Sequence, residues 1–201
     1  MPHRRRLQVS KENAVECQRP GRAIEVLVFS IKRCELPAQA LHARYKVEGA
    51  YVDCYTTVLR GTFSHAQFVE SFYTTLLFKL ERLILFALVA KPSTDEQARK
   101  LSIGKIDQFA AWSVEGRAEN QLLMCDFMGH TRSWLMVAIE DWEGDVVTRL
   151  YFGSVIVPII NKQTGKRELG FAFKVLVPFH KIYTRALLAA AKFSIKNRFG
   201  L

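Results

Sequence analysis

The chain has 201 residues, of which 49% are hydrophobic and 11% aromatic, enough for one domain with a substantial core. Its formal net charge of +10 is unevenly spread: residues 1–48 carry 10 basic and 5 acidic side chains, residues 49–150 carry 10 and 13, and residues 151–201 carry 9 and 1. Basic ends can attract nucleic acid, an anionic membrane or an acidic partner, but solvated basic faces are also common. No nucleic-acid-binding signature is present.

Cysteine spacing and apolar runs exclude several further classes. The four cysteines, Cys17, Cys34, Cys54 and Cys125, include no CxxC pair, so neither a zinc site nor a redox motif is predicted and reduced thiols are expected. The basic start is followed by a polar stretch where a secretion signal needs an apolar one. The strongest apolar run, 83–90, is too short for the roughly 20 residues that span a bilayer. We therefore expect a cytoplasmic protein without a transmembrane segment, metal or cofactor.

The first fifty residues give the weakest structural signal. Residues 1–22 have the composition of a disordered basic tail. Residues 23–48 form a lead-in whose place in the core the sequence leaves open, although 23–31 is rich in β-branched residues. From Tyr51 the pattern is firmer, and alternation over 51–59 predicts a strand that Gly61 closes.

Two helices are predicted after this strand. Ser64 stands at an N-cap position before apolar residues at four-residue spacing, which predicts one helix of about 26 residues ending near Lys91 and Pro92. Ser93 or Thr94 then caps a shorter helix to about Ile103. Glu81 and Arg82 interrupt the longer helix, and we expect both at its boundary with solvent.

In the second half of the chain the hydrophobic pattern first has the two-residue period of strands and then the period of a helix. Strands are predicted over 108–116, 121–129, 132–140 and 146–158, and their short connections favour an antiparallel meander. Residues 170–177 are either a further strand or a lead-in. After Pro178 a long amphipathic helix is expected to bury one stripe. That stripe comprises Phe179, Ile182, Tyr183, Ala186, Leu187, Ala190 and Phe193.

This order resembles the helix-grip fold of the START/Bet v 1-like superfamily. The fold class would be α+β: a curved antiparallel sheet, with two helices after the first strand, packed on a long C-terminal helix in a single domain over 49–201. The first helix departs from the short helix pair usual there. A cystatin-like or nuclear-transport-factor-like cone is the alternative, but there the long helix normally comes first. The resemblance implies an apolar cavity and leaves function open, because members include carriers, receptors, cyclases and chaperone activators.

No catalytic motif is present, so polar groups within apolar strands are the best candidates for a site. Asp126 and Arg132 are predicted to pair across adjacent strands. Their pairing would either fix register or orient a ligand. Glu115 and Arg117 are expected to share a face and could extend the polar spot. The remaining ligand-binding candidates are Trp112, Trp134, Tyr151, His180 and Tyr183.

Three functions follow from these features. The first is binding of a small hydrophobic or amphipathic ligand in a cavity between sheet and terminal helix. The second is an interaction protein with a filled core, whose basic C-terminal helix meets an anionic partner. The third is a cyclase- or hydratase-like acid-base enzyme using Asp126, Arg132, Glu115, Arg117, His180 or Tyr183. The basic partner surface would comprise Lys162, Lys166, Arg167, Lys174, Lys181, Arg185, Lys192, Lys196 and Arg198.

Overall fold

A computed structural model describes residues 31–47, 50–89, 92–160, 167–168 and 171–200. The predicted tail over 1–22 lies outside these residues, as do 23–30 of the lead-in. The described elements are β1 (Lys32–Arg33), α2 (Arg44–Val47), β2 (Tyr51–Arg60), α3 (His65–Tyr73), α4 (Leu76–Val89), α5 (Asp95–Ser102), β3 (Gln108–Phe109), β4 (Trp112–Ala118), β5 (Gln121–Asp126), β6 (Thr131–Trp142), β7 (Asp145–Ile156), β8 (Ile159–Ile160), β9 (Arg167–Glu168) and α6 (Phe171–Phe199).

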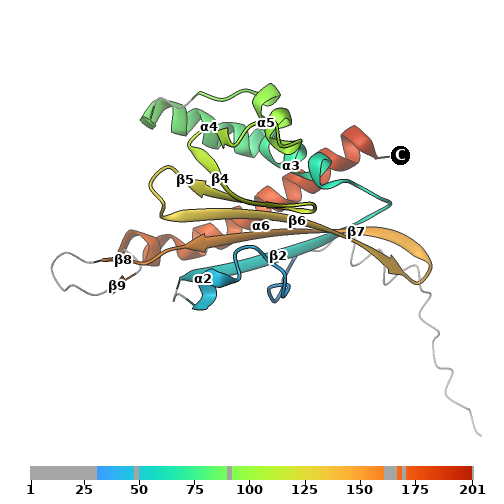
Figure 1. Cartoon of the computed structure of the whole chain (residues 1–201), viewed down its shortest axis with the longest axis horizontal. Coiled ribbons are helices and arrows are strands. Elements are labelled where there is room, and N and C mark those ends of the chain that lie inside the picture. The colour runs from blue at the N-terminus through green and yellow to red at the C-terminus, as the bar shows by residue number, and fades with distance from the viewer. Residues whose placement is uncertain (1–30, 48–49, 90–91, 161–166, 169–170, 201) are drawn as a thin grey trace, which may run out of the picture.

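The centre of the fold is an open antiparallel sheet of seven strands in the order β1-β2-β7-β6-β5-β4-β3 (Figure 1). The predicted strands and the meander from β4 to β7 are confirmed, although the first strand candidate is split by a turn into β3 and β4. Pairing of β2 with β7 joins strands that are far apart in the sequence and runs from Tyr51–Ile156 to Arg60–Val147. The chain is therefore α+β, with a C-terminal helix packed on the sheet.

The predicted 26-residue helix is wrong, because the chain breaks it into α3 and α4 at Thr74 and Thr75. The Thr74 hydroxyl donates to the Glu70 carbonyl, and the Thr75 hydroxyl donates to the Phe72 carbonyl. Thr75 also accepts the backbone N–H of Phe78, which is the bond that an N-cap makes. Threonine side chains that bond nearby backbone groups compete with helix hydrogen bonds, and here they end one helix and start the next.

The predicted helix starts are confirmed at both N-caps. Ser64 begins α3 and Thr94 begins α5, and each forms a capping box with the glutamine three residues later. Gly104 follows α5 with a φ of +73°, a conformation that glycine adopts without strain.

Both faces of the sheet are covered (Figure 1). Helices α3, α4, α5 and α6 bury the larger core, which is rich in aromatic side chains such as Phe68, Phe72 and Tyr73. On the other face, the part of the lead-in over 31–47 packs on a smaller core around Trp134 and Met136. The lead-in thus supplies the second layer of the domain.

Helix α6 differs from its prediction in extent and in orientation. It begins at Phe171 and continues through Pro178, so a strand over 170–177 is ruled out from Phe171 onward. Its buried side comprises Thr184, Leu187, Leu188, Ala191 and Ile195. Leu and Ala let the helix lie close to the sheet, whereas three bulky members of the predicted stripe, Phe179, Ile182 and Phe193, are 63%, 66% and 67% exposed. No helix among the described residues is long and apolar enough to cross a membrane.

One basic side chain of α6 is half-buried against β2. Lys192 donates to the Thr57 hydroxyl at 2.8 Å, and burial, with a smaller contribution from Lys196, lowers the pKa of Lys192 from 10.5 to about 8. The fold therefore disfavours the charged amine, a penalty that is complete below pH 8 and disappears as pH rises to 10.5.

We expect Lys192→Met to raise the free energy of unfolding at pH 7 by about 1 kcal/mol, a value reduced both by solvent screening of the half-exposed amine and by the lost bond to Thr57. Urea denaturation at pH 7 and pH 10 checks this, with exposed Lys105→Met as the matched control. A stabilisation that is equal at both pH values, or that Lys105→Met reproduces, would contradict the assignment.

Candidate functional site

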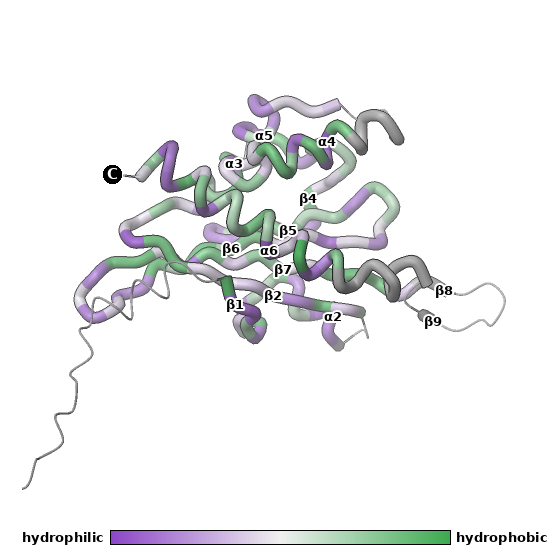
Figure 2. Tube along the Cα trace, turned by 180° about the vertical axis from the view of Figure 1, so that it is seen from behind, coloured by the Kyte–Doolittle hydropathy of each residue, from purple (hydrophilic) through white to green (hydrophobic). Residues whose placement is uncertain are grey.

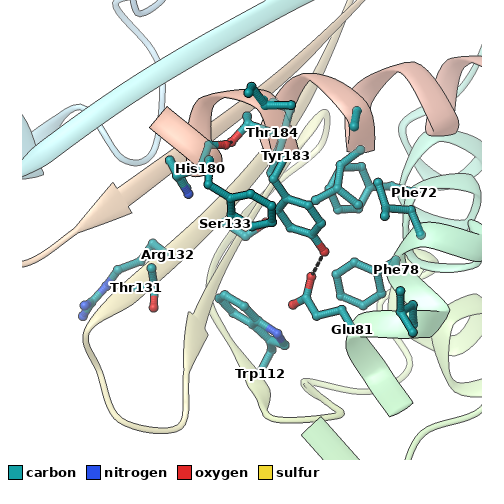
Figure 3. A pocket seen from close by; sticks show the side chains of 18 residues that line it. Phe72, Phe78, Glu81, Trp112, Thr131, Arg132, Ser133, His180, Tyr183 and Thr184 are labelled. Atoms are coloured by element: carbon teal, nitrogen blue, oxygen red, sulfur yellow. Dashed lines mark hydrogen bonds between the residues drawn. The ribbon is translucent and has the colours of Figure 1, made fainter. Parts of the chain in front are cut away.

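A pocket of about 620 Å³ opens between α6, α4 and the adjoining face of β6 and β7 (Figure 3). Its volume lies in the range that small-molecule sites occupy. Eighteen residues line it: Phe72, Leu77, Phe78, Leu80, Glu81, Trp112, Thr131, Arg132, Ser133, Phe152, Ser154, Phe179, His180, Ile182, Tyr183, Thr184, Ala186 and Leu187.

The pocket wall is mainly apolar and aromatic. Phe72 and Phe152 lie with ring centroids 4.7 Å apart at its floor, and Phe179 stacks on Tyr183 at its side. Exposed apolar side chains on α4 and α6, including Leu80 and Ile182, form its rim. Figure 2 shows hydrophobic residues along the coloured part of α4, interrupted by hydrophilic ones. Such a wall favours an apolar ligand over a polar one.

Glu81 is the acidic group of this pocket, which corrects its predicted place at the solvent boundary. The Tyr183 hydroxyl, on α6, donates a hydrogen bond to Glu81 Oε2 on α4 (Figure 3). Burial raises the pKa of the Glu81 carboxyl, and the bond from Tyr183 offsets part of that rise. The neighbouring cations Lys79 and Arg82 both pair with Asp95 instead.

A second polar group stands where α6 crosses β2. Asp53 is fully buried, and its Oδ1 accepts the backbone N–H of Ser154 at 3.0 Å while Oδ2 accepts the Tyr51 hydroxyl at 3.2 Å. His180 Nε2 lies 3.4 Å from Asp53 Oδ2, and His180 lines the pocket. The arrangement places a histidine within ion-pair distance of a buried carboxylate, a combination of groups that acid-base enzymes use.

Trp112 brings the β4 edge into the pocket. Its indole Nε1 is buried and has no hydrogen-bond partner among the described residues. A buried donor without a partner costs about 1–3 kcal/mol. Figure 3 shows the nitrogen on the side of the ring toward Glu81.

The predicted pair of Asp126 and Arg132 does not form. Asp126 accepts bonds from the His130 backbone and the Thr131 hydroxyl, which closes the β5–β6 turn. Cys125, rather than Asp126, lies opposite Arg132, and successive residues of a strand point to opposite faces. The two side chains therefore leave opposite sides of the sheet.

Arg132 instead joins a cluster on the face covered by α2. Its Nε donates to Glu115 Oε2 at 3.0 Å, and its guanidinium lies 4.8 Å from the ring centroid of Tyr45. Glu115 also pairs with Arg44. These bonds hold α2 on the sheet, so the guanidinium is engaged away from the pocket although Arg132 contributes to the wall.

Four further candidates lie outside the pocket: Glu115, Arg117, Trp134 and Tyr151. The expected shared face of Glu115 and Arg117 is wrong, because a β-bulge shifts the register between Val114 and Gly116, and Arg117 bonds to the Ile106 carbonyl and Asp107. Trp134 and Tyr151 pack together on the second face, 6.2 Å apart. Trp112, His180 and Tyr183 are thus the predicted residues whose side chains the structure gathers at the pocket.

The sequence did not point to Asp53, Thr131, Ser133, Ser154 or Thr184, which supply the remaining polar side chains near the pocket. Asp53 had a signal, since it is an acidic residue within an apolar strand, the same pattern that drew attention to Asp126. Within the described ranges no three His, Cys, Asp or Glu side chains gather as metal ligands.

Several residues of the predicted basic surface bond within the protein. Arg185 lies over the Tyr55 ring, Lys192 bonds to Thr57, and Arg198 pairs with Glu70. These contacts attach α6 to β2 and α3.

Neither the models of known protein families nor the curated protein sequences contain a match to the chain.

Proposed function

We propose that the protein binds a small hydrophobic or amphipathic ligand in the pocket between its sheet and α6. The observation that carries the proposal is a pocket of about 620 Å³ with an aromatic wall and a few polar groups, the combination typical of ligand sites. The helix-grip architecture is part of this proposal. The break between α3 and α4 removes the single long helix that departed from this pattern, and α3, α4 and α5 then make three short helices between β2 and β3.

The proposal can be tested by measuring the binding of an apolar dye to variants at two alanines of α6. Ala186 lines the pocket, whereas Ala189, also exposed on α6, does not. We expect the neutral dye N-phenyl-1-naphthylamine to bind the wild type with enhanced fluorescence, and Ala186→Trp to weaken that binding at least tenfold because the indole fills the pocket. Ala189→Trp should bind like the wild type. Equal binding by all three proteins, or none by the wild type, would exclude the pocket as the site.

Native mass spectrometry of the protein purified under non-denaturing conditions complements the dye. A co-purified mass that is lost on denaturation, and that is absent from Ala186→Trp, would give the natural ligand class.

The Asp53–His180 pair favours a second candidate function, acid-base catalysis on the bound ligand. A carrier returns its ligand unchanged, whereas an enzyme converts it. Incubating the recovered ligand with wild type and with His180→Gln distinguishes them: conversion by the wild type alone would support catalysis. Failure of the wild type to bind the dye would favour the remaining alternative, an interaction protein with a filled core.

A further inference from the structure

We propose that the ligand carries a hydroxyl group, held between the Glu81 carboxylate and the indole N–H of Trp112. This inference rests on the proposed function and specifies the chemical class of the ligand: an aliphatic or alicyclic alcohol with an otherwise apolar body.

Glu81 provides the acceptor. Its carboxylate faces an apolar pocket, and in the described part of the chain no Lys, Arg or His lies within ion-pair distance of it. Tyr183 donates one hydrogen bond to Oε2, but a carboxylate has about four acceptor positions. A ligand group that donates a hydrogen bond would therefore be stabilised at this point.

Trp112 provides the donor. The indole nitrogen can only donate, and among the described residues its buried N–H has no acceptor. A ligand oxygen beside it would remove the cost of that unpaired donor. Both side chains line the same pocket, and Figure 3 shows them on its same side.

One donor and one acceptor that line the same pocket select among polar groups. A hydroxyl donates its proton to Glu81 and accepts from Trp112 at the same time. A carboxylate would be repelled by Glu81, and an ammonium would pair with Glu81 but leave the Trp112 N–H without an acceptor. An ether or ester oxygen would accept a hydrogen bond from Trp112 but has no hydrogen to donate to Glu81.

Four twelve-carbon probes test the inference at pH 7 by displacement of N-phenyl-1-naphthylamine: 1-dodecanol, its methyl ether, dodecanoate and dodecylamine. We expect 1-dodecanol to bind wild type about tenfold more tightly than the ether, the size of one hydrogen bond to a charged group. Dodecanoate should bind more weakly than the alcohol. If none of the four binds, the proposed function fails. If the ether equals the alcohol, or dodecylamine binds most tightly, the pocket is real and the hydroxyl inference is wrong.

Two variants separate the two contacts. Glu81→Leu removes the acceptor and should abolish the preference for alcohol over ether, while Trp112→Phe removes the donor and should weaken both ligands about equally, by roughly fivefold. Glu81→Leu leaves the Tyr183 hydroxyl without its acceptor, so Glu81→Leu/Tyr183→Phe serves as the second form of that variant. A preference that persists in both forms would overturn the role of Glu81. The ratio of the affinities of the wild type for 1-dodecanol and for its methyl ether requires no variant. It therefore tests the inference even if a substitution prevents folding.

Discussion

Gly153→Ala is expected to lower the free energy of unfolding by about 3 kcal/mol, the upper part of the range for overpacking. A Cβ at Gly153, on β7, would lie 2.6 Å from His42 Nε2 and 2.9 Å from the Asp53 carbonyl oxygen. Side chains do not approach so closely, so the imidazole or the backbone of β2 must move. Urea denaturation of the variant measures the cost.

A second strand glycine provides the matched control. A Cβ at Gly116 would have Leu41 Cδ1 as its nearest neighbour, at 3.6 Å, which is ordinary contact. Gly116→Ala should therefore change stability by less than 1 kcal/mol. If both variants cost the same, the close approach of His42 to β7 is wrong.

A double-mutant cycle assigns the cost to its cause. In a His42→Ala background the methyl group at 153 enters space that the imidazole occupied, so Gly153→Ala should cost about 1–2 kcal/mol less than in wild type. The remainder belongs to the Asp53 carbonyl, which stays in place. Additive effects would show that His42 does not restrict this position.

The strands could be predicted from sequence because their signals are local. Alternating β-branched and aromatic residues mark β2 and β4 to β7, and short connections leave antiparallel pairing as the available arrangement. The two helix starts were equally clear from Ser64 and Thr94. The predictions that were wrong concern the direction in which side chains point. A break in a helix, or a shift of one residue in strand register, moves a side chain to a different face.

Glu81 shows how the orientation of a helix determines which residues line the pocket. In one continuous helix Leu76 and Leu80 would share the buried side with Phe68 and Phe72. The break at Thr74 and Thr75 turns α4 so that Leu76 and Leu80 are 85% and 54% exposed, while Phe78 is buried and Glu81 lines the pocket. The signal was the threonine pair, whose hydroxyls bond to backbone groups and interrupt the apolar spacing.

Contacts of the lead-in could not be predicted, because nothing local marks them. His42 lies in a segment with no clear periodicity, yet it is fully buried with its ring 4.3 Å from that of Trp134. Its place depends on the absence of a side chain at Gly153, far along the chain. Packing of this kind, between His42 and Gly153, can be recognised only in the three-dimensional structure, in which the lead-in lies on the sheet.

Burial of His42 should make the protein sensitive to acid. Desolvation lowers the pKa of His42 from 6.5 to about 4, although Asp53 opposes part of that shift. The unfolded chain therefore binds a proton more readily than the folded one. The stability that follows is complete above pH 6.5 and is lost as pH falls toward 4, by about 3 kcal/mol for this one group.

Urea denaturation of wild type and His42→Gln between pH 7 and pH 4 checks this expectation. The variant lacks the titrating ring, so it should lose about 3 kcal/mol less than wild type over that interval even if it starts less stable. Carboxylates also titrate there, but they are common to both proteins and cancel in the difference. His130→Gln, at an exposed position of the β5–β6 turn, controls for removal of a histidine. Parallel curves for wild type and His42→Gln would mean that protons reach His42 without unfolding the layer that covers it.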